Sequence, residues 1–552
     1  MSESGSRMRG GVLAIVFAAG TLVSLNSAAQ LNKPTREDAT GRWVGEYTLD
    51  HQRVFLVVRL KKENEKWVGT YNRPVLDWEN DLDLRNLQID RNQIAFNLGD
   101  ASSVIHVETR WVANSLQGTV KAARVQGKIV LEPTAILPKE YLDTLAGNYE
   151  AAGGSYVIER ENNYLCFLNR RTGRSGRLVP ASETQFWTGP GIDIWYPEQT
   201  WFEFVRRSDG QPTQLKVRRG RTRSLTLDRK VLYTREEVEF ENAGTKLSGT
   251  LRIPAEGRRG PALVILHGSN YQTRGGQYGA LAFVGDQFAR NGFAVLNYDK
   301  RGTGKSGGKR DDDPELLSGD AAAAVGLLRT RPEVNPGIIG LWGISQGGIL
   351  EPLVAQKTDR LAFFINVSGA VVNTNEQEIQ RTELKLRADG FSKDEVNAAV
   401  HLQRVKFRYA CKRDNWDEYE TVLRAAQGKA WLPDPYIGPP ESRGDDAWDF
   451  WKCGVDPGKY LESVRVPVLY LQGEFEAYSK PLENLARLRQ AMQVAGNPHF
   501  EHKLLPGAEH SMFKARTGGE KELPFLNTYV DGYFPLLTDW AKRQADSALR
   551  HP

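Results

Sequence analysis

The chain has 552 residues, too many for one ordinary hydrophobic core, so about two to four domains are expected. Its formal net charge of +5 arises from 73 basic and 68 acidic residues, so the surface carries both signs and is not strongly basic. The arginine-rich stretch 218–223 lacks interleaved aromatic residues, which favours a solvated strand face over a nucleic-acid site. Composition and charge therefore indicate several domains and argue against a nucleic-acid-binding protein.

The N-terminus has the pattern of an export signal. Two arginines precede the apolar stretch 11–25, and the small residues 27–29 follow it at the positions that a signal peptidase reads. The pattern predicts a signal peptide over 1–29, cleavage after Ala29, and a periplasmic or secreted protein. A retained anchor is the alternative, although the stretch is short for a full span. No other apolar run is long enough to cross a bilayer, so no stable membrane span is expected after cleavage.

The next two hundred residues have the pattern of antiparallel β structure. Residues 40–138 contain short alternating apolar segments separated by turns, such as 53–60 and 93–98. A second unit of the same kind is predicted over 145–228. We therefore expect two small β-barrel or sandwich domains before the C-terminal half of the chain.

From residue 235 the pattern changes to strands that alternate with helices, as a parallel sheet requires. The residues Gly343-Ile344-Ser345-Gln346-Gly347 match G-x-S-x-G between an apolar run, 338–342, and a helix-like segment, 346–357. Ser345 would therefore lie on the sharp strand-to-helix turn known as the nucleophile elbow. The alternative is an ordinary small residue at a tight crossing, so partners elsewhere in the chain decide between the two.

Two downstream turns supply those partners in the order that the fold requires, an acid and then a histidine. The apolar run 466–473 is predicted to be a buried strand that ends in a glycine turn, and Glu474 and Glu476 follow it. The segment 503–510 is predicted to be a short strand and a turn that delivers His510. His510 is therefore the candidate general base.

These motifs resemble the α/β-hydrolase superfamily, in particular bacterial serine esterases and prolyl-oligopeptidase-like peptidases. The resemblance covers roughly residues 235–545 and includes the runs 264–269 and 297–306. In the family the acid lies three residues after the strand-end glycine, which selects Glu476 over Glu474, although Asp is the commoner residue there. Four motifs in one order are together specific, although none is specific alone.

The resemblance implies acyl transfer by a Ser345–Glu476–His510 triad through a covalent acyl-enzyme. It also implies an oxyanion hole made of the backbone N–H groups of Ser269 and Gln346. His267 is expected to brace the oxyanion loop, and a direct contact with substrate is the alternative. Arg274 is expected either to bind substrate or to hold that loop through an ion pair.

Neither a cofactor nor a metal is predicted. Gly304-Lys305-Ser306 resembles the end of a P-loop, but Asp299 occupies the position of the required first glycine. The glycines of the segment 302–307 match a dinucleotide fingerprint, but a polar, acidic loop follows instead of a helix. No cluster of Cys, His and carboxylate residues has metal-ligand spacing.

A helical cap insertion is expected between the elbow and the acid, at about 371–460. Its three predicted helices span 376–387, 393–411 and 416–427. The insertion would cover Ser345, and three of its aromatic side chains would either line an acyl pocket or pack the cap against the core. These aromatic residues are Trp448, Phe450 and Trp451.

The cysteines agree with export, because disulfides persist outside the cytosol. Cys411 and Cys453 both fall in the insertion, where a bridge between them is plausible, and Cys166 is expected to be a buried thiol elsewhere.

The sequence does not determine whether the enzyme cleaves an ester or an amide bond. A carboxylesterase acting on a small-molecule ester is favoured because the β units lack the period of a propeller. A serine peptidase or amidase acting on a peptide is the alternative. A binding protein with an inactive hydrolase part is the third hypothesis, and the complete triad argues against it.

Overall fold

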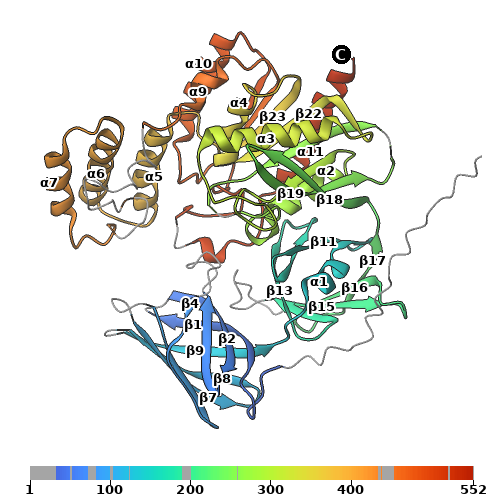
Figure 1. Cartoon of the computed structure of the whole chain (residues 1–552), viewed down its shortest axis with the longest axis vertical. Coiled ribbons are helices and arrows are strands. Elements are labelled where there is room, and N and C mark those ends of the chain that lie inside the picture. The colour runs from blue at the N-terminus through green and yellow to red at the C-terminus, as the bar shows by residue number, and fades with distance from the viewer. Residues whose placement is uncertain are drawn as a thin grey trace, which may run out of the picture.

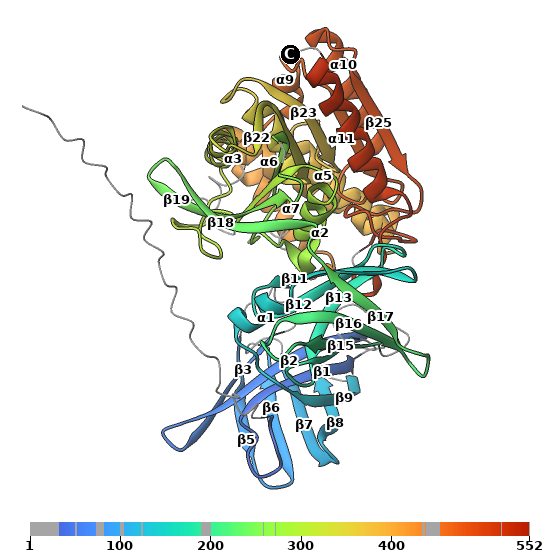
Figure 2. The ribbon, with the colours of Figure 1, turned by 90° about the vertical axis from the view of Figure 1, so that its right-hand side faces the viewer.

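The computed structural model describes residues 33–49, 52–72, 82–99, 104–122, 125–188, 200–257, 259–270, 272–432, 437, 453–519 and 522–550. The predicted signal peptide and the aromatic residues Trp448, Phe450 and Trp451 lie outside these ranges. Three sheets follow one another along the longest axis of the molecule, with an eight-stranded barrel between the other two (Figures 1 and 2).

The first sheet has nine strands in the order β4-β3-β2-β1-β9-β8-β7-β6-β5. Along β7 buried and exposed residues alternate, as expected for a strand with one face on a core. Trp43, Tyr47 and Phe96 are fully buried on that core face. The strands are β1 (Gly41–Leu49), β2 (Gln52–Glu63), β3 (Lys66–Asn72), β4 (Leu82–Asp83), β5 (Arg85–Ile89), β6 (Gln93–Leu98), β7 (Ile105–Val112), β8 (Ser115–Ala122) and β9 (Val125–Thr134).

The second sheet is a closed barrel of consecutive antiparallel strands, in which β17 pairs back onto β10. Its interior is filled by apolar side chains, among them Phe167, Phe186 and Phe202. A short helix, α1 (Lys139–Leu145), leads into it. The strands are β10 (Gly147–Ala151), β11 (Gly154–Glu161), β12 (Tyr164–Asn169), β13 (Ser175–Pro180), β14 (Gln185–Thr188), β15 (Thr200–Arg206), β16 (Pro212–Arg219) and β17 (Leu225–Lys230).

The third sheet has the strand order β18-β19-β21-β20-β22-β23-β24-β25. Its first two pairings are antiparallel and all later ones are parallel, so we call it the mixed sheet. Its strands are β18 (Tyr233–Asn242), β19 (Thr245–Pro254), β20 (Gly260–Leu266), β21 (Ala294–Tyr298), β22 (Val334–Ile344), β23 (Leu361–Val367), β24 (Val468–Gly473) and β25 (Phe500–Leu505).

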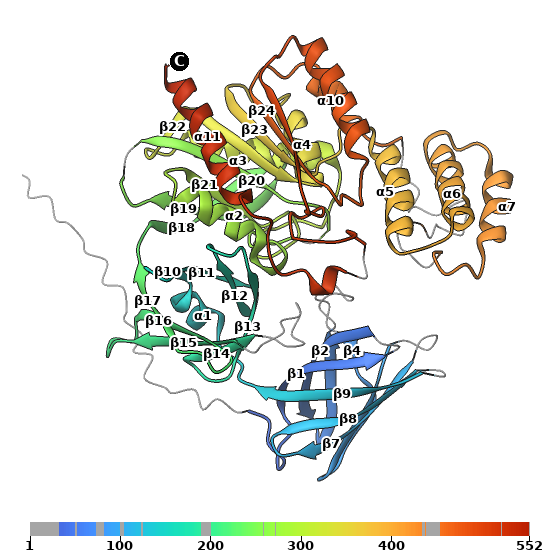
Figure 3. The same cartoon turned by 180° about the vertical axis from the view of Figure 1, so that it is seen from behind.

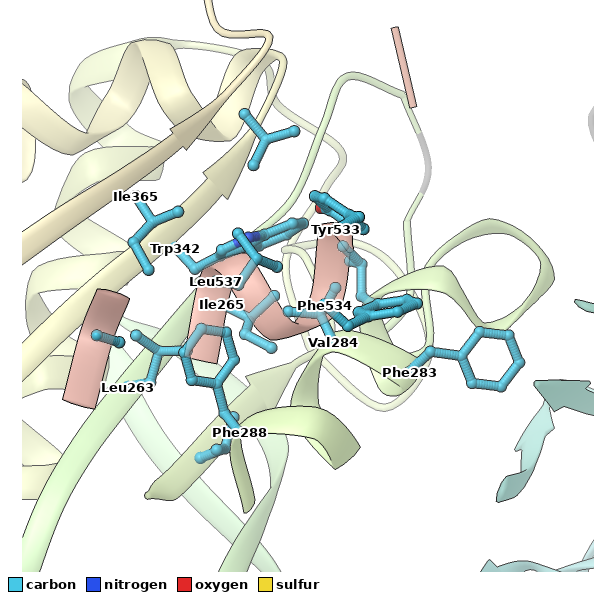
Figure 4. Packing of buried hydrophobic residues seen from close by; sticks show 14 of the residues in the cluster. Leu263, Ile265, Phe283, Val284, Phe288, Trp342, Ile365, Tyr533, Phe534 and Leu537 are labelled. Carbon is cyan, nitrogen blue, oxygen red and sulfur yellow. The ribbon is translucent and has the colours of Figure 1, made fainter. Parts of the chain in front are cut away.

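Helices cover both faces of the mixed sheet because its central strands are apolar on both sides. Alternate residues of β20 show this directly, since Leu263 and Ile265 join one core and Val264 joins the other. Figure 4 shows the first core, where Trp342 of β22 packs against Leu537. The helices of that face are α2 (Ala280–Ala289) and α11 (Tyr533–Arg550), and those of the other are α3 (Pro314–Arg329), α4 (Gln346–Val354), α9 (Pro457–Leu461) and α10 (Pro481–Ala495).

The predicted insertion between β23 and β24 contains three described helices that precede α9. They are α5 (Thr374–Ala388), α6 (Lys393–Lys412) and α7 (Trp416–Ala426), and they extend to one side of the mixed sheet (Figure 3). A disulfide between Cys411 and Cys453 ties the end of α6 to the chain before α9. Cys166 is a buried thiol on β12.

The helix predicted over 346–357 is shorter than expected. Helix α4 ends at Val354, three residues before the end predicted at Lys357. The N–H groups of Gln356 and Lys357 bond three residues back, to the carbonyls of Leu353 and Val354, so the last turn is tighter than an α-helix.

The barrel meets the mixed sheet through buried charges. Arg170, after β12, donates two hydrogen bonds to Asp286 of α2, at 2.9 and 2.7 Å, and the Tyr233 hydroxyl donates a third at 2.8 Å. Asp286 is fully buried. Burial alone would raise the pKa of Asp286, but Arg170 more than offsets it and the pKa is lowered. Asp286 is therefore ionised in the folded protein, where it pairs with Arg170 between the barrel and the mixed sheet.

The nine-stranded sheet meets the barrel through a smaller apolar contact. Val44 and Val57 of the sheet pack against Val179 and Trp187 of the barrel. The backbone N–H of Ala135 also donates to the carbonyl of Pro180 at 3.2 Å.

Candidate active site

Ser345 lies on a strained turn at the carboxyl end of β22. Its backbone has φ 53° and ψ −117°, a conformation that costs a residue with a side chain about 1–3 kcal/mol. Two close approaches require the flanking glycines. A Cβ on Gly343 would lie 2.4 Å from the carbonyl carbon of Gly347, and one on Gly347 would lie 2.5 Å from the carbonyl oxygen of Leu266. The motif therefore serves a turn that presents Ser345 at the edge of the sheet.

Glu476 and His510 form a hydrogen-bonded pair beyond the ends of β24 and β25. The Nδ1 of His510 lies 2.8 and 3.0 Å from the two carboxylate oxygens of Glu476. Both residues are buried. Glu474, the other candidate acid, is exposed and instead accepts a hydrogen bond from the N–H of Gly507 at 2.8 Å.

The end of β23 connects the serine turn to the histidine turn. The N–H of Ser345 donates to the carbonyl of Val367 at 2.9 Å, and the hydroxyl of the next residue, Ser368, donates to the carbonyl of His510 at 2.8 Å. Within the described residues no hydrogen bond joins Ser345 to His510 itself. Such contacts are often long before a substrate binds, so the arrangement is compatible with a proton transfer between them.

Neighbouring carboxylates set the charge state of His510. Burial would lower the pKa of the imidazole, but Glu476, together with Glu509, outweighs burial and raises the pKa above its ordinary value of 6.5. Glu509 is itself buried, which raises its pKa to about 7. Its carboxylate accepts from the N–H groups of Ser511 and Phe513, both at 2.9 Å, and so fixes the turn that carries His510.

The two predicted oxyanion donors flank the serine turn. Gln346 is the first residue of α4, where a backbone N–H has no partner within the helix. Ser269 follows β20, and the side chain of Gln272 shapes its turn by accepting from the N–H of Gly268 at 3.2 Å and donating to the carbonyl of Ser269 at 3.1 Å. Because β20 and β22 are parallel neighbours, both N–H groups lie at the edge that holds Ser345.

His267 and Arg274 have structural contacts. The Nε2 of His267 is 2.5 Å from the carbonyl of Tyr298, and burial together with nearby Lys300 lowers its pKa to about 4, so the ring is neutral. Arg274 forms ion pairs with Asp299 and Glu237, both at 2.8 Å. Of the two predicted roles for Arg274, the ion pair that holds the loop is the one observed.

Residues 243–511 match the family model described as X-Pro dipeptidyl-peptidase (S15 family). The match begins at the turn between β18 and β19 and ends just past His510, so it includes strands β19 to β25 and the turns that carry Ser345, Glu476 and His510. Over these residues the chain has an α/β-hydrolase domain. Its mixed sheet with the flanking helices is the hydrolase domain, of the esterase and peptidase kind.

Two fungal proteins are similar over shorter stretches. Thiohydrolase aneE of Aspergillus aculeatus is 34% identical over 149 residues, which are 26% of this chain and 45% of that protein. Polyketide transferase ATR5 of Stachybotrys chlorohalonatus is 37% identical over 137 residues, 24% of this chain and 44% of that protein. The chain spans less than half the length of these curated relatives.

Among solved structures, the Pyrococcus furiosus esterase Pf2001 has a similar chain. The likeness covers 57% of this chain and 94% of the esterase, at 16% identity and a TM-score of 0.34. Because the TM-score is this low, the fold assignment rests on the strand order of the mixed sheet and not on this likeness.

Two side chains that were not predicted from the sequence, Tyr478 and Lys300, also lie at this edge of the hydrolase domain. The ring of Tyr478 packs against the ring of His510, with centroids 4.2 Å apart and an interplanar angle of 34°, and the backbone N–H of Tyr478 donates to Glu476 at 2.8 Å. Lys300 is buried and reaches the side chain of Gln346 at 2.7 Å. Tyr478 follows Glu476 by two residues, and Lys300 lies in the segment 297–306 that resembles the family. Their closeness in sequence to these motifs could have identified both residues as candidates. Their contacts with His510 and Gln346, however, depend on the fold.

Within the described ranges, no group of three or more His, Cys, Asp or Glu side chains could hold a metal ion. None of the helices described is long and apolar enough to cross a membrane.

Proposed function

We propose that the chain is an exported serine hydrolase that cleaves acyl esters through an acyl-enzyme on Ser345. One observation carries the proposal. The Glu476–His510 pair, with Nδ1 2.8 Å from the carboxylate, lies at the sheet edge where Ser345 occupies a strained strand-to-helix turn. A histidine whose Nδ1 is held by a carboxylate presents Nε2 as the proton acceptor.

The reaction follows the roles of these groups. Ser345 Oγ attacks the acyl carbon while its proton passes to Nε2 of His510, and Glu476 stabilises the imidazolium that forms. The carbonyl oxygen becomes negative and accepts hydrogen bonds from the N–H groups of Ser269 and Gln346. The intermediate collapses, and the leaving alcohol takes the proton from His510. A water molecule then repeats the sequence on the acyl-enzyme and releases the acid and free Ser345.

Helices α5–α7 would act as the cap of this site. Two residues of α5 support this role, because the Arg381 guanidinium carbon lies 5.5 Å and the Lys385 ammonium 5.4 Å from the ring centroid of Tyr478. That ring packs against His510, so α5 lies close to the imidazole. The substrate would enter between α5 and the sheet edge.

Export is proposed on two features of the chain. Residues 1–29 have the pattern of a signal peptide, with cleavage after Ala29, and the Cys411–Cys453 disulfide suits an oxidising compartment. We therefore expect the protein to be periplasmic or secreted, with this disulfide formed.

A peptidase or amidase of the prolyl-oligopeptidase-like kind is the second candidate. The match to a family model named for an X-Pro dipeptidyl-peptidase favours it. Ester and amide hydrolysis use the same triad and differ in how the leaving group is bound and protonated, so the residues described above serve both.

A substrate panel separates the two. Purified protein would be assayed with p-nitrophenyl esters of increasing acyl length, acyl thioesters and X-Pro anilides, with Ser345→Ala as the blank. We expect the highest kcat/KM on an ester. A higher kcat/KM on an anilide would replace the esterase proposal with the peptidase, and no turnover of any member would reject both.

A further inference from the structure

Lys300 is a buried cation that lies between the two proposed oxyanion donors. It follows β21, and its side chain is 4% exposed. Burial lowers the pKa of Lys300 and its partner Asp312 partly restores it. A lysine in such a place costs folding free energy, so its partners should explain why the fold retains it.

The three N–H donors of the ammonium reach three different segments. One reaches Asp312 at 2.7 Å, one reaches the side-chain oxygen of Gln346 at 2.7 Å, and one reaches the backbone carbonyl of Asn270 at 3.4 Å. Asn270 is the neighbour of Ser269. A single side chain thus connects the residue that supplies one N–H donor to the residue next to the other.

The backbone of Lys300 supports the same turn. Its N–H donates to the carbonyl of Gln272 at 3.2 Å, and the Thr303 hydroxyl donates to that carbonyl at 2.9 Å. Gln272 in turn bonds both Gly268 and Ser269. The loop after β21 therefore holds the Ser269 turn through backbone and side chain together.

We propose that Lys300 is a positioning residue of the oxyanion hole, which fixes the spacing of the Ser269 and Gln346 N–H groups and places a positive charge beside the developing oxyanion. The inference rests on the proposed function of Ser345. All three ammonium donors are used within the protein, so Lys300 acts through these segments and not by direct contact with the substrate.

A positioning role predicts a particular kinetic signature. The oxyanion exists in the transition state and not in the bound ester, so Lys300→Met should lower kcat and kcat/KM together while KM changes little. Removing one oxyanion donor typically costs about 100-fold to 1000-fold, and we expect about 10-fold to 100-fold for its support. Affinity for a trifluoromethyl ketone, which adds to the serine and forms an oxyanion, should fall in parallel.

The matched control is Lys305→Met in the same loop. Lys305 also forms an ion pair, with Glu237 at 2.8 Å, but its side chain is 66% exposed. Its replacement should leave kcat and inhibitor affinity unchanged. Because Lys300→Met leaves the carboxylate of Asp312 with only the ion pair to Arg310 at 3.1 Å among the described residues, the double variant Lys300→Met/Asp312→Asn is tested beside it. Thermal unfolding checks that each variant is folded.

A double-mutant cycle with Gln346→Leu locates the effect. Leu keeps the backbone N–H and removes only the acceptor for Lys300, so the two losses should be strongly non-additive. Additive losses, or Lys300 variants that keep wild-type kcat and ketone affinity, would overturn the positioning role. A wild-type protein that neither turns over esters nor binds the ketone would instead overturn the proposed function, and the positioning role with it.

Discussion

The two sides of the candidate site are held by different parts of the molecule. Ser345 is held within the hydrolase domain, by the backbone of β22, the glycine contacts and the first turn of α4. His510 is held by the side chain of Glu476 and by a loop that pairs with the barrel. The difference indicates that the nucleophile depends on the hydrolase domain alone, whereas the base depends also on the N-terminal part of the chain.

A series of backbone hydrogen bonds connects the barrel to the turn that carries His510. The N–H of Tyr529 donates to the carbonyl of Gly173 in the barrel at 3.0 Å, and the N–H of Val530 donates to Met512 at 2.9 Å. The N–H of Glu509 then donates to the carbonyl of Phe513 at 3.0 Å. The barrel therefore braces the histidine turn.

The largest effect is expected on the serine side. Ser345→Ala should lower ester turnover by about 10⁴-fold to 10⁶-fold, because the attacking oxygen is lost while the hydrolase fold stays intact. Steady-state assays check the rate and circular dichroism checks the fold. Turnover within about 10-fold of the wild type would move the nucleophile elsewhere.

The second largest effect is expected from replacing Glu476, the acid that pairs with His510. Glu476→Gln should lower kcat by about 10³-fold to 10⁴-fold, because a neutral amide neither fixes the tautomer of His510 nor stabilises its charged form. Glu474→Gln is the matched control, since Glu474 is exposed and its side chain accepts a hydrogen bond from the N–H of Gly507, not from His510. If the control loses more activity than Glu476→Gln, Glu474 is the acid.

A smaller effect should follow from disturbing the barrel contact. Gly173 has φ +70°, and a Cβ there would lie 2.9 Å from the carbonyl oxygen of Tyr529. Gly173→Ala should lower kcat by about 10-fold through displacement of the His510 loop. Gly244→Ala is its control, with φ +71° and open space around the Cβ, and should affect stability but not kcat. Equal kcat values in the two variants would show that the barrel does not brace His510.

The smallest expected effect is a shift in the pH profile. His510 accepts a proton only when it is neutral, so kcat/KM should fall as the pH drops through its pKa. The groups that face it are Glu476 and Glu509, which raise the pKa, and Arg381, which lowers it, and the net result lies above 6.5. The acid limb of the profile should lie above pH 6.5 and move to lower pH in Glu476→Gln. A wild-type limb below pH 6.5 would contradict this balance of charges.

Sequence reasoning identified the backbone-determined parts of the site well. The G-x-S-x-G motif predicted the glycines at 343 and 347 that the tight turn requires, and the glycine-plus-three spacing selected Glu476, the carboxylate found against His510. Helix limits were less accurate at α4, whose tightened last turn depends on local geometry.

Contacts between distant segments could not be predicted in the same way. Nothing in the local pattern around Gly173 indicates that its carbonyl meets Tyr529, more than 350 residues later. The Arg170–Asp286 pair and the reach of Lys300 to Gln346 likewise depend on how complete elements pack. Hydrophobic periodicity and motif spacing describe one helix, strand or turn at a time, whereas these contacts join several of them.

The central claim is that Ser345 is the nucleophile of a serine hydrolase. The most direct test is to label the protein with a fluorophosphonate and to locate the adduct by peptide mass spectrometry, with Ser345→Ala and the exposed Ser224→Ala as variants. The account predicts one adduct, on Ser345, that persists in Ser224→Ala and disappears in Ser345→Ala. An adduct on another residue, or equal labelling of Ser345→Ala, would contradict it.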